Sequence, residues 1–259
     1  MELSGKKALV TGGGSGLGKA AALAMADAGA DIALIGRTES ELRETGDAIE
    51  AKGRKALVLI ADISDEAAMQ KAFGTIAEAF GQLDVVFANA GINGTWAPIE
   101  KLSYEQWNKT VSINLGGTFL TVHLAVPLLK QHGGSVIITA SINGTRTFTT
   151  AGASAYSTTK AGQVAFAQMA ALELAKHRIR VNVICPGAIE SQISDNTEMI
   201  DRDEAKVPAN YPEGTIPLTG GKPGKAEQVA DLVCFLASDR SSHISGTPIW
   251  IDGAQSLLI

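Results

Sequence analysis

The sequence predicts an α/β protein with a doubly wound, seven-stranded parallel β-sheet and helices on both faces. Short β-branched, apolar runs alternate with longer helical patterns along the whole chain. The short runs are apolar throughout rather than at every second position, as expected of strands that are covered on both faces. Strand–helix alternation of this kind gives right-handed βαβ units and therefore parallel strands.

Seven apolar runs are the expected strands, at 7–12, 31–36, 55–62, 83–91, 134–141, 180–187 and 247–253. Helical patterns lie between them, near 17–28, 39–52, 65–80, 103–131, 154–177 and 226–238. The third helix should begin with Ser64 as its cap and with acidic residues in its first turn. Pro127 falls inside the long fourth helix, which it should kink or interrupt.

The domain organisation is expected to be simple. The chain of 259 residues contains no linker, repeat or low-complexity run, so we expect a single domain over residues 1–259. Its least regular segment, at about 188–225, is rich in proline, glycine and acidic residues. Because a loop that long inside a compact domain is usually functional, we expect it to be a substrate lid.

Composition narrows the class of protein and its compartment. Hydrophobic residues make up 45% and charged residues 19%, which is typical of a soluble globular protein, and no apolar run is long enough to span a bilayer. The first strand pattern begins too early to leave room for a signal peptide. Cys185 and Cys234 lie in apolar runs and are expected to be free thiols, which favours the cytoplasm.

Two classes of ligand are disfavoured by the same composition. Two cysteines and four scattered histidines give no metal-ligand spacing, so we expect no metal site. The formal net charge of −5 argues against a nucleic-acid-binding surface.

A glycine-rich turn follows the first expected strand. The segment "TGGGSGLG" places Gly12, Gly16 and Gly18 at G-x-x-x-G-x-G spacing. Glycines at such positions permit a tight turn, a close approach to a pyrophosphate and close packing of the next helix. A turn without any ligand is the alternative. Its position between a strand and a helix favours dinucleotide binding at the helix N-terminus.

The end of the second strand indicates which dinucleotide is bound. An acidic residue there would bind the ribose 2′-hydroxyl of NAD, whereas an arginine suits the 2′-phosphate of NADP. In this chain Gly36 takes the place of the acid, and Arg37 and Thr38 follow. A solvated arginine at a strand end is the alternative. We expect NADP(H) to be favoured, with NAD(H) as the other candidate cofactor.

Tyr156 and Lys160 are four residues apart in the fifth helical pattern, so they lie on one face of the helix. By themselves they fit an ordinary solvated helix face. Alternatively they form an acid–base pair, since a lysine charge about 4 Å away would lower a phenol pKa by up to roughly three units.

Together these motifs resemble those of the classical short-chain dehydrogenase/reductase family. They are "TGGGSGLG", "NAG" at 89–91, "NLGG" at 114–117, Ser141, "YSTTK" at 156–160 and "PGAIES" at 186–191. The resemblance covers essentially the whole chain, including the closing "SGTPIWIDGAQ". There are two departures: Ala88 stands where the family often has asparagine, and Ser191 where it often has threonine.

The resemblance implies a Rossmann fold and a catalytic tetrad of Asn114, Ser141, Tyr156 and Lys160. Tyr156 would exchange a proton with the substrate oxygen, and Ser141 would orient that oxygen. Lys160 would also hold the nicotinamide ribose, and Asn114 would help to bind a water that relays protons to Lys160. A homotetramer is also implied, packed through the two long helices and the C-terminal strand region.

The expected cofactor contacts follow from the motifs and the resemblance together. They are Gly12, Ser15, Gly16, Leu17, Gly18, Arg37, Thr38, Asp62, Ile63, Asn89, Ala90, Gly91, Tyr156, Lys160, Pro186, Gly187, Ile189 and Ser191. The substrate candidates are Trp96, Ile142, Asn143, Ile189, Gln192 and Tyr211. Arg146 is a weaker candidate for binding an anionic substrate group, because a structural ion pair or a subunit contact is the favoured explanation for it.

The lid segment contains seven acids and two bases between Glu190 and Gly214, namely Glu190, Asp195, Glu198, Asp201, Asp203, Glu204, Glu213, Arg202 and Lys206. That charge disfavours an acyl carrier protein or a coenzyme A thioester, although a solvated acidic face is the ordinary explanation. The sequence therefore predicts an oxidoreductase that transfers a hydride between NADP(H) and a small neutral alcohol or ketone. The alternatives are a 3-oxoacyl thioester reductase and a non-catalytic NAD(P)-sensing regulator.

Overall fold

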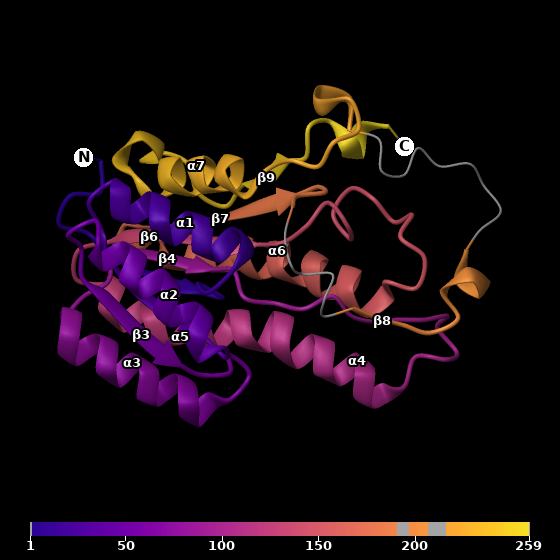
Figure 1. The fold of residues 1–259 in the computed structure, drawn as a ribbon, viewed down its shortest axis with the longest axis horizontal. Helices are drawn as coiled ribbons and strands as arrows, with labels where there is room; N and C mark the ends of the chain where they lie inside the picture. The colour runs from indigo at the N-terminus through magenta and orange to yellow at the C-terminus, as the bar shows by residue number, and fades with distance from the viewer. Residues whose placement is uncertain (1, 191–196, 207–215, 259) are drawn as a thin grey trace.

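The computed structural model describes residues 2–190, 197–206 and 216–258. Seven parallel strands form the main sheet in the order β3-β2-β1-β4-β6-β7-β9 (Figure 1). Their bounds are β1 Lys7–Thr11, β2 Asp31–Gly36, β3 Ala56–Ile60, β4 Val85–Ala88, β6 Gly134–Thr139, β7 Ile179–Pro186 and β9 Pro248–Ile251. The predicted seven-stranded parallel sheet is therefore confirmed.

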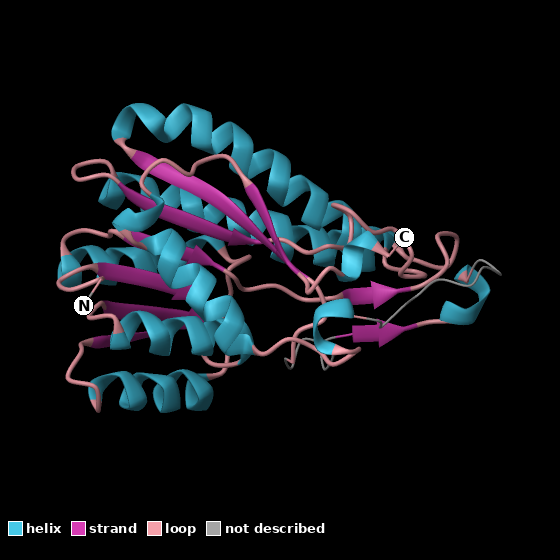
Figure 2. Ribbon diagram, turned by 90° about the horizontal axis from the view of Figure 1, so that it is seen from above, coloured by secondary structure: helices cyan, strands magenta, loops and turns pink. Residues whose placement is uncertain are grey.

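Helices cover both faces of this sheet (Figure 2). One face packs against α1 Gly16–Asp27, α2 Glu39–Glu50 and α7 Ala226–Ala237. The other face packs against α3 Glu66–Phe80, α5 Gly117–Leu129 and α6 Ser154–Leu174. Short 3₁₀ turns complete the described helices: η2 Ala175–His177, η4 Arg202–Ala205, η5 Pro217–Thr219, η6 Asp239–Ser241 and η7 Gln255–Leu257.

The strands divide their side chains between two hydrophobic cores. In β1, Leu9 packs into the core beneath α3, α5 and α6, whereas Ala8 and Val10 pack into the core beneath α1, α2 and α7. The same alternation holds in β4, where Val86 faces the first core and Phe87 the second. Both faces of β1 and β4 are therefore buried, which explains why the patterns of these strands are apolar at every position.

A second, two-stranded sheet lies beyond the carboxyl ends of the main sheet (Figure 2). It pairs β5 Gly94–Trp96 with β8 Thr197–Met199 in parallel. The strand β8 and the turns η4 and η5 belong to the segment expected to be an irregular lid. A bridge between Ile189 and Gly224 joins the two ends of that segment.

The fourth helix differs from its prediction. It runs as α4 Tyr104–Val111, a π-helical turn η1 Ser112–Gly116, and α5, and it continues past Pro127 to Leu129. Pro127 therefore does not end the helix, and the described irregularity is the π-helical turn around Asn114. The predicted cap of the third helix is also wrong. Asp65 accepts from the Ala68 N–H, while the Ser64 hydroxyl donates to Asp62 (2.7 Å).

The expectation that no apolar segment could span a bilayer also needs correction. The helix Tyr104–Leu129 is long and apolar enough to do so by length and composition alone. In the fold its Val122, Ala125 and Leu129 are packed into the core between the sheet, α3 and α6, so burial accounts for part of the hydropathy of the helix. In all, 33% of its most apolar stretch is buried.

Candidate active site

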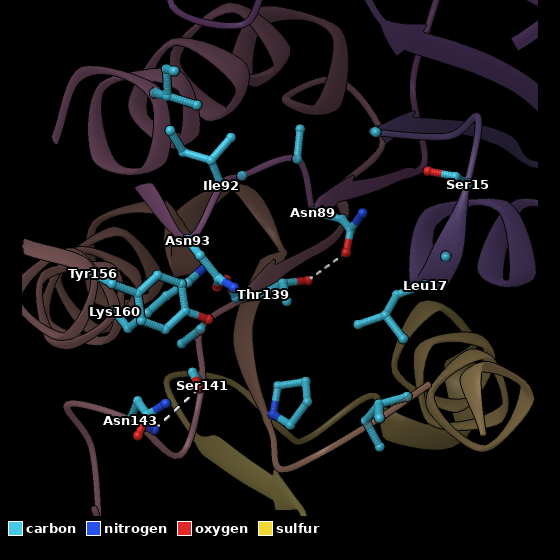
Figure 3. A pocket seen from close by; sticks show the side chains of 18 of the residues that line it. Ser15, Leu17, Asn89, Ile92, Asn93, Thr139, Ser141, Asn143, Tyr156 and Lys160 are labelled. Carbon is cyan, nitrogen blue, oxygen red and sulfur yellow. Dashed lines mark hydrogen bonds between the residues drawn. The ribbon is translucent and has the colours of Figure 1, made fainter. Parts of the chain in front are cut away.

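A cleft of about 800 Å³ lies at the carboxyl ends of the parallel strands. It straddles the point between β1 and β4 where the strand order reverses, which is where open parallel sheets bind ligands. Figure 3 shows Tyr156 and Lys160 together on one side of the cleft, and Ser15 and Leu17 of the glycine-rich turn on the other.

Most of the predicted cofactor residues line this cleft. They are Gly12, Ser15, Gly16, Leu17, Arg37, Thr38, Asp62, Ile63, Asn89, Ala90, Gly91, Tyr156, Lys160, Pro186, Gly187 and Ile189. Gly18 lies behind the turn, and Ser191 lies outside the described residues.

The glycine-rich turn has the backbone that its sequence requires. Gly12 and Gly16 have φ angles of +69° and +50°, which are strained for other residues. A Cβ added at Gly18 would lie 2.0 Å from the Gly12 carbonyl oxygen, so Gly18 serves the packing of α1 against β1. The start of α1 faces the cleft and brings the positive end of the helix dipole with it. This part of the cleft therefore fits a dinucleotide pyrophosphate.

Asn89 holds three strand ends together beside the turn. Its backbone N–H donates to the Thr11 hydroxyl (3.0 Å), and its Nδ2 donates to the Thr11 carbonyl (3.2 Å). Its Oδ1 accepts from the Thr139 hydroxyl (3.2 Å; Figure 3). The floor of the cleft is thus fixed across β1, β4 and β6.

The ends of β2 and β3 carry Arg37, Thr38 and Asp62, which the sequence analysis linked to the cofactor. The Arg37 side chain is 59% exposed, and its Nη1 lies 3.9 Å from Asp62 Oδ2, so it forms a long ion pair with the end of the neighbouring strand. Burial alone would raise the pKa of Asp62. Hydrogen bonds from Ser64 and the charge of Arg37 outweigh this effect, and the pKa is lowered. Thr38 directly precedes α2, and its side chain makes no capping hydrogen bond to the helix.

Tyr156, Lys160 and Ser141 are buried together at the opposite end of the cleft, with 7%, 3% and 8% of their surface exposed. Lys160 Nζ donates to the Thr139 carbonyl (2.8 Å) and lies 5.4 Å from the centroid of the Tyr156 ring. Ser141 is hydrogen-bonded to the Tyr156 hydroxyl, and its own Oγ accepts from the Asn143 N–H (3.1 Å; Figure 3).

Burial dominates the electrostatics of this pair. It raises the pKa of Tyr156 to about 12, against a smaller lowering by the Ser141 hydrogen bond. It also lowers the pKa of Lys160 to about 8. The expected lowering of the phenol pKa is therefore wrong in direction for the protein itself, where burial raises the pKa of Tyr156.

Asn114 lies behind the cleft wall, fully buried in the π-helical turn. Its Oδ1 accepts from the Ile92 N–H (2.8 Å), and its Nδ2 donates to the Ile92 carbonyl (2.9 Å) and to the Thr159 hydroxyl (3.1 Å). A Cβ added at Gly91 would lie 3.0 Å from Asn114 Oδ1 and 3.8 Å from Lys160 Nζ. Asn114 therefore pins the loop after β4 close to Lys160.

Gln163 is a buried residue that the sequence did not single out. Its Nε2 donates to the Asn114 carbonyl (3.0 Å) and to the Thr118 hydroxyl (2.7 Å). The first of these hydrogen bonds gives the Asn114 carbonyl a donor within the π-helical turn, where the regular helical hydrogen bonding changes. Gln163 thus connects α6, which carries Tyr156 and Lys160, to Asn114.

Only some of the predicted substrate residues can be placed relative to the cleft. Trp96, Ile142, Asn143 and Ile189 line the cleft, whereas Gln192 and Tyr211 lie outside the described residues. Arg146 does not line the cleft: its guanidinium stacks 3.6 Å from the centroid of the Trp250 ring. The prediction that Arg146 binds an anionic group of the substrate is therefore not supported.

Several lining residues were not predicted individually: Glu41, Asn93, Thr139, Thr150, Arg202 and Gln255. Asn93 lies two residues after the "NAG" motif at 89–91, which the sequence analysis assigned to the cofactor site. Arg202 was counted only as a lid charge. Its side chain lies over the Trp96 ring (5.3 Å to the centroid), a contact between positions that no local pattern connects.

Metal and thiol chemistry have little support in the described part of the chain. Within residues 2–190, 197–206 and 216–258, no three His, Cys, Asp or Glu side chains form a group that could hold a metal ion. Cys185 and Cys234 are both free thiols, as predicted, with Cys185 buried and Cys234 partly buried.

Comparisons with known proteins place the chain in a family. Residues 12–254 match a family model described as enoyl-(acyl carrier protein) reductase. Levodione reductase of Leifsonia aquatica is 36% identical over 253 residues, covering 96% of this chain and 93% of the relative. The chain belongs to the classical short-chain dehydrogenase/reductase family.

Solved structures agree with this assignment. One from Sinorhizobium meliloti 1021, described as a 3-ketoacyl-ACP reductase, has a TM-score of 0.94 and 53% identity. The match covers 98% of this chain and 100% of that one. Other solved relatives were crystallised in complex with NADP, NAD or NADH. The Rossmann fold is confirmed, and the relatives are consistent with the predicted use of a nicotinamide dinucleotide.

Proposed function

We propose that this protein is an NADP(H)-preferring dehydrogenase/reductase that interconverts a small alcohol and the corresponding ketone. The observation that carries the proposal is the burial of Tyr156, Lys160 and Ser141 at one end of a cleft whose other end has a glycine-rich turn and an arginine. Relatives named as dehydrogenases of cyclohexanol and of a dichlorocyclohexadiene diol support the alcohol/ketone class.

In the proposed mechanism Tyr156 is the general acid/base. When bound, the nicotinamide cofactor supplies the hydride to, or removes it from, the substrate carbon. In reduction Tyr156 gives its phenolic proton to the substrate oxygen, which becomes the alcohol hydroxyl. Its raised pKa keeps that proton in place at neutral pH. In oxidation the proton returns to Tyr156. Ser141 donates a hydrogen bond to the substrate oxygen and orients it.

Lys160 and Asn114 support this proton transfer. The Lys160 ammonium stabilises the phenolate that forms when Tyr156 loses its proton, and it holds the ribose next to the nicotinamide. Asn114 keeps the loop after β4 beside Lys160 through its two hydrogen bonds to Ile92. We assign Asn114 the binding of a relay water in that space.

NADP(H) is the proposed cofactor, with NAD(H) as the alternative, because Gly36 and Arg37 stand where an NAD-specific site has an acid. Arg37 and Thr38 both line the cleft, and Arg37 turns toward it far enough to reach Asp62. The other predicted cofactor contacts keep their proposed roles, including Ser191, which lies outside the described residues.

The remaining proposals concern the protein as a whole. We assign residues 1–259 to one dinucleotide-binding and catalytic domain, with a substrate lid at about 188–225. The proposed enzyme acts in the cytoplasm on a small molecule. It has no nucleic-acid or membrane partner in this proposal. A homotetramer is proposed. Exposed apolar side chains on α5 and α6 (Phe119, Met169 and Leu172) and near the C-terminus (Leu257 and Leu258) support it. A monomer mass by light scattering at micromolar concentration would refute it.

A 3-oxoacyl thioester reductase is the second candidate, favoured by the 53% identity to a structure described as a 3-ketoacyl-ACP reductase. The acidic lid argues against it less strongly than the sequence suggested. Asp201 and Glu204 both pair with Lys101 (2.7 Å each), and Asp203 pairs with Lys206 (2.6 Å). The non-catalytic sensor is disfavoured because a sensor does not need Tyr156 and Lys160 together.

The test is NADPH and NADH oxidation by the purified enzyme across ketones, aldehydes, sugars and acetoacetyl thioesters. The proposal expects turnover of small ketones with NADPH. Faster reduction of a carrier-linked acetoacetyl group than of any small ketone would establish the second candidate instead. No turnover of any compound, with tight NADPH binding, would favour the sensor.

A further inference from the structure

Arg202 is a charged residue of the cleft that the proposed chemistry does not use. It lies in η4, lines the cleft, and donates from Nε to the Ala151 carbonyl (3.3 Å). Ala151 is five residues before Tyr156, just ahead of α6. The next residue back, Thr150, donates to Asn143 (2.9 Å), whose N–H donates to Ser141 (3.1 Å). Arg202 is thus hydrogen-bonded to the segment before α6, which is linked through Thr150 and Asn143 to Ser141.

The turn that carries Arg202 is firmly held. Its backbone continues from the β5–β8 ladder through a hydrogen bond from the Ile200 N–H to the Trp96 carbonyl (2.9 Å). Lys101 binds two acids close to Arg202 in the chain, Asp201 and Glu204, at 2.7 Å each. The arginine is therefore presented to the cleft from a fixed position, which lowers the entropic cost of binding a ligand.

The terminal amino groups of Arg202 retain their charge for a ligand. Among the described residues no carboxylate lies within ion-pair distance of this guanidinium. The adjacent Asp203 pairs with Lys206 instead (2.6 Å), and the charge of Arg202 is the smallest influence on its pKa. The acids that line the cleft within the described chain are Glu41 and Asp62, which lie at the adenosine end beside Gly14 and Arg37.

Trp96 adds a second feature to this wall. Its ring lies under the Arg202 guanidinium, at 5.3 Å from its centroid, and it lines the same cleft. Its Nε1–H is buried and meets no acceptor in the described part of the protein. The donors that this wall offers to the cleft are therefore those of the Arg202 guanidinium, and an anionic ligand group supplies acceptors for them.

We propose that Arg202 binds a carboxylate of the substrate, so that the preferred substrate is a small oxo acid or hydroxy acid. This inference rests on the proposed alcohol/ketone chemistry and replaces the expectation of a neutral substrate. That expectation came from the acidic lid, in which Asp201, Asp203 and Glu204 prove to be ion-paired. A guanidinium stacked on an aromatic ring and open to a cleft matches the planar geometry of a carboxylate.

The test compares oxo acids with their uncharged methyl esters: acetoacetate, levulinate and 5-oxohexanoate, each paired with its ester, with NADPH as reductant. The readout is the ratio of kcat/KM for acid over ester within each variant. For at least one pair the wild-type ratio should be about ten- to a hundredfold, as expected of a charge-assisted contact. Arg202→Leu should reduce that ratio to near one, and Arg202→Lys should retain part of it.

Lys206→Leu is the matched control, because it removes the same charge from the same segment without touching the cleft. Its acid-to-ester ratio should equal that of the wild type. If Arg202→Leu fails to fold, Arg202→Gln removes the charge while keeping a donor for Ala151. Wild-type ratios near or below one for every pair, or a ratio unchanged by removing the Arg202 charge, would overturn the proposal.

Calorimetric binding of the unreactive acids butyrate and pentanoate to the NADPH-loaded enzyme separates this proposal from the proposed function. If no ketone turns over but either acid binds in an Arg202-dependent manner, the alcohol/ketone chemistry fails and the carboxylate site stands. If neither acid binds and no pair shows an acid preference, the carboxylate site is refuted, whatever the turnover of neutral ketones.

Discussion

The two ends of the cleft are built on different physical principles. At the proposed catalytic end, Tyr156 and Lys160 are buried, and hydrogen bonds to Ser141 and to the Thr139 carbonyl fix them in place. At the adenosine end, Arg37 is mostly exposed and meets Asp62 at the long distance of 3.9 Å. Burial shifts the pKa values of side chains strongly, and a buried side chain cannot be replaced without disturbing its packing. At an exposed position, solvent screens the charge and weakens its interactions. Substitutions should therefore have large effects at the catalytic end and graded effects at the adenosine end.

The largest effect is expected from Lys160→Ala. It removes the charge that stabilises the Tyr156 phenolate and leaves the buried Thr139 carbonyl without its donor. Turnover should fall by about 10² to 10⁴-fold, and cofactor affinity should fall with it. Lys176→Ala, at an exposed position just after α6, is the control. Measuring kcat and the Kd of NADPH in both variants checks this. A Lys160→Ala enzyme with normal turnover would show that the buried pair is only structural.

A smaller and more selective effect is expected from Arg37→Ala. A charge-assisted contact to a phosphate is worth about 1.5–3 kcal/mol, or roughly ten- to a hundredfold in affinity. Arg37→Ala should lower kcat/KM for NADPH by that factor and leave NADH nearly unchanged. Gly36→Asp should go further and favour NADH, because a carboxylate repels the 2′-phosphate. The three atoms nearest to a Cβ at Gly36 all belong to the Leu42 side chain, the first at 3.3 Å, so a side chain there requires Leu42 to move by a few tenths of an ångström.

The measurement is the NADPH-to-NADH ratio of kcat/KM in the wild type and both variants. Equal use of the two cofactors by the wild type would contradict the assignment of Arg37. So would a ratio that Arg37→Ala leaves unchanged.

The smallest of these effects is a pH dependence. Burial lowers the pKa of Lys160 to about 8, so its charge is complete well below pH 8 and is lost as the pH rises through that value. With NADPH in excess, kcat/KM for ketone reduction should fall about tenfold between pH 7 and pH 9. Tyr156, with its pKa raised to about 12, keeps its proton over that range. Activity that stays level to pH 10 would contradict the assignment of Lys160.

The sequence predicted those parts of the molecule that depend on local patterns. The apolar runs gave the seven strands, and the glycine spacing gave the turn that opens α1, because strand burial and positive φ angles select residue types directly. The motifs also located Tyr156, Lys160 and Ser141, which the structure brings together across α6 and the end of β6.

What escaped prediction depends on contacts between distant segments. The π-helical turn at Asn114 is held by Gln163, 49 residues later in the chain. Lys101 pairs with two lid acids that are about a hundred residues away, Asp201 and Glu204, which the charge count could not anticipate. The pKa of Tyr156 was predicted in the wrong direction for the protein alone, because the spacing of two side chains carries no information about their burial.

The central claim is that Tyr156 transfers the proton, and Tyr156→Phe tests it most directly, because the change removes one hydroxyl and keeps the buried ring. The measurement is single-turnover reduction of a ketone by the NADPH-loaded enzyme, with the Kd of NADPH determined in parallel. Turnover should fall by about 10² to 10⁴-fold while the Kd stays within a few-fold of the wild-type value. A variant that keeps more than roughly a tenth of wild-type turnover under chemistry-limited conditions would contradict the account.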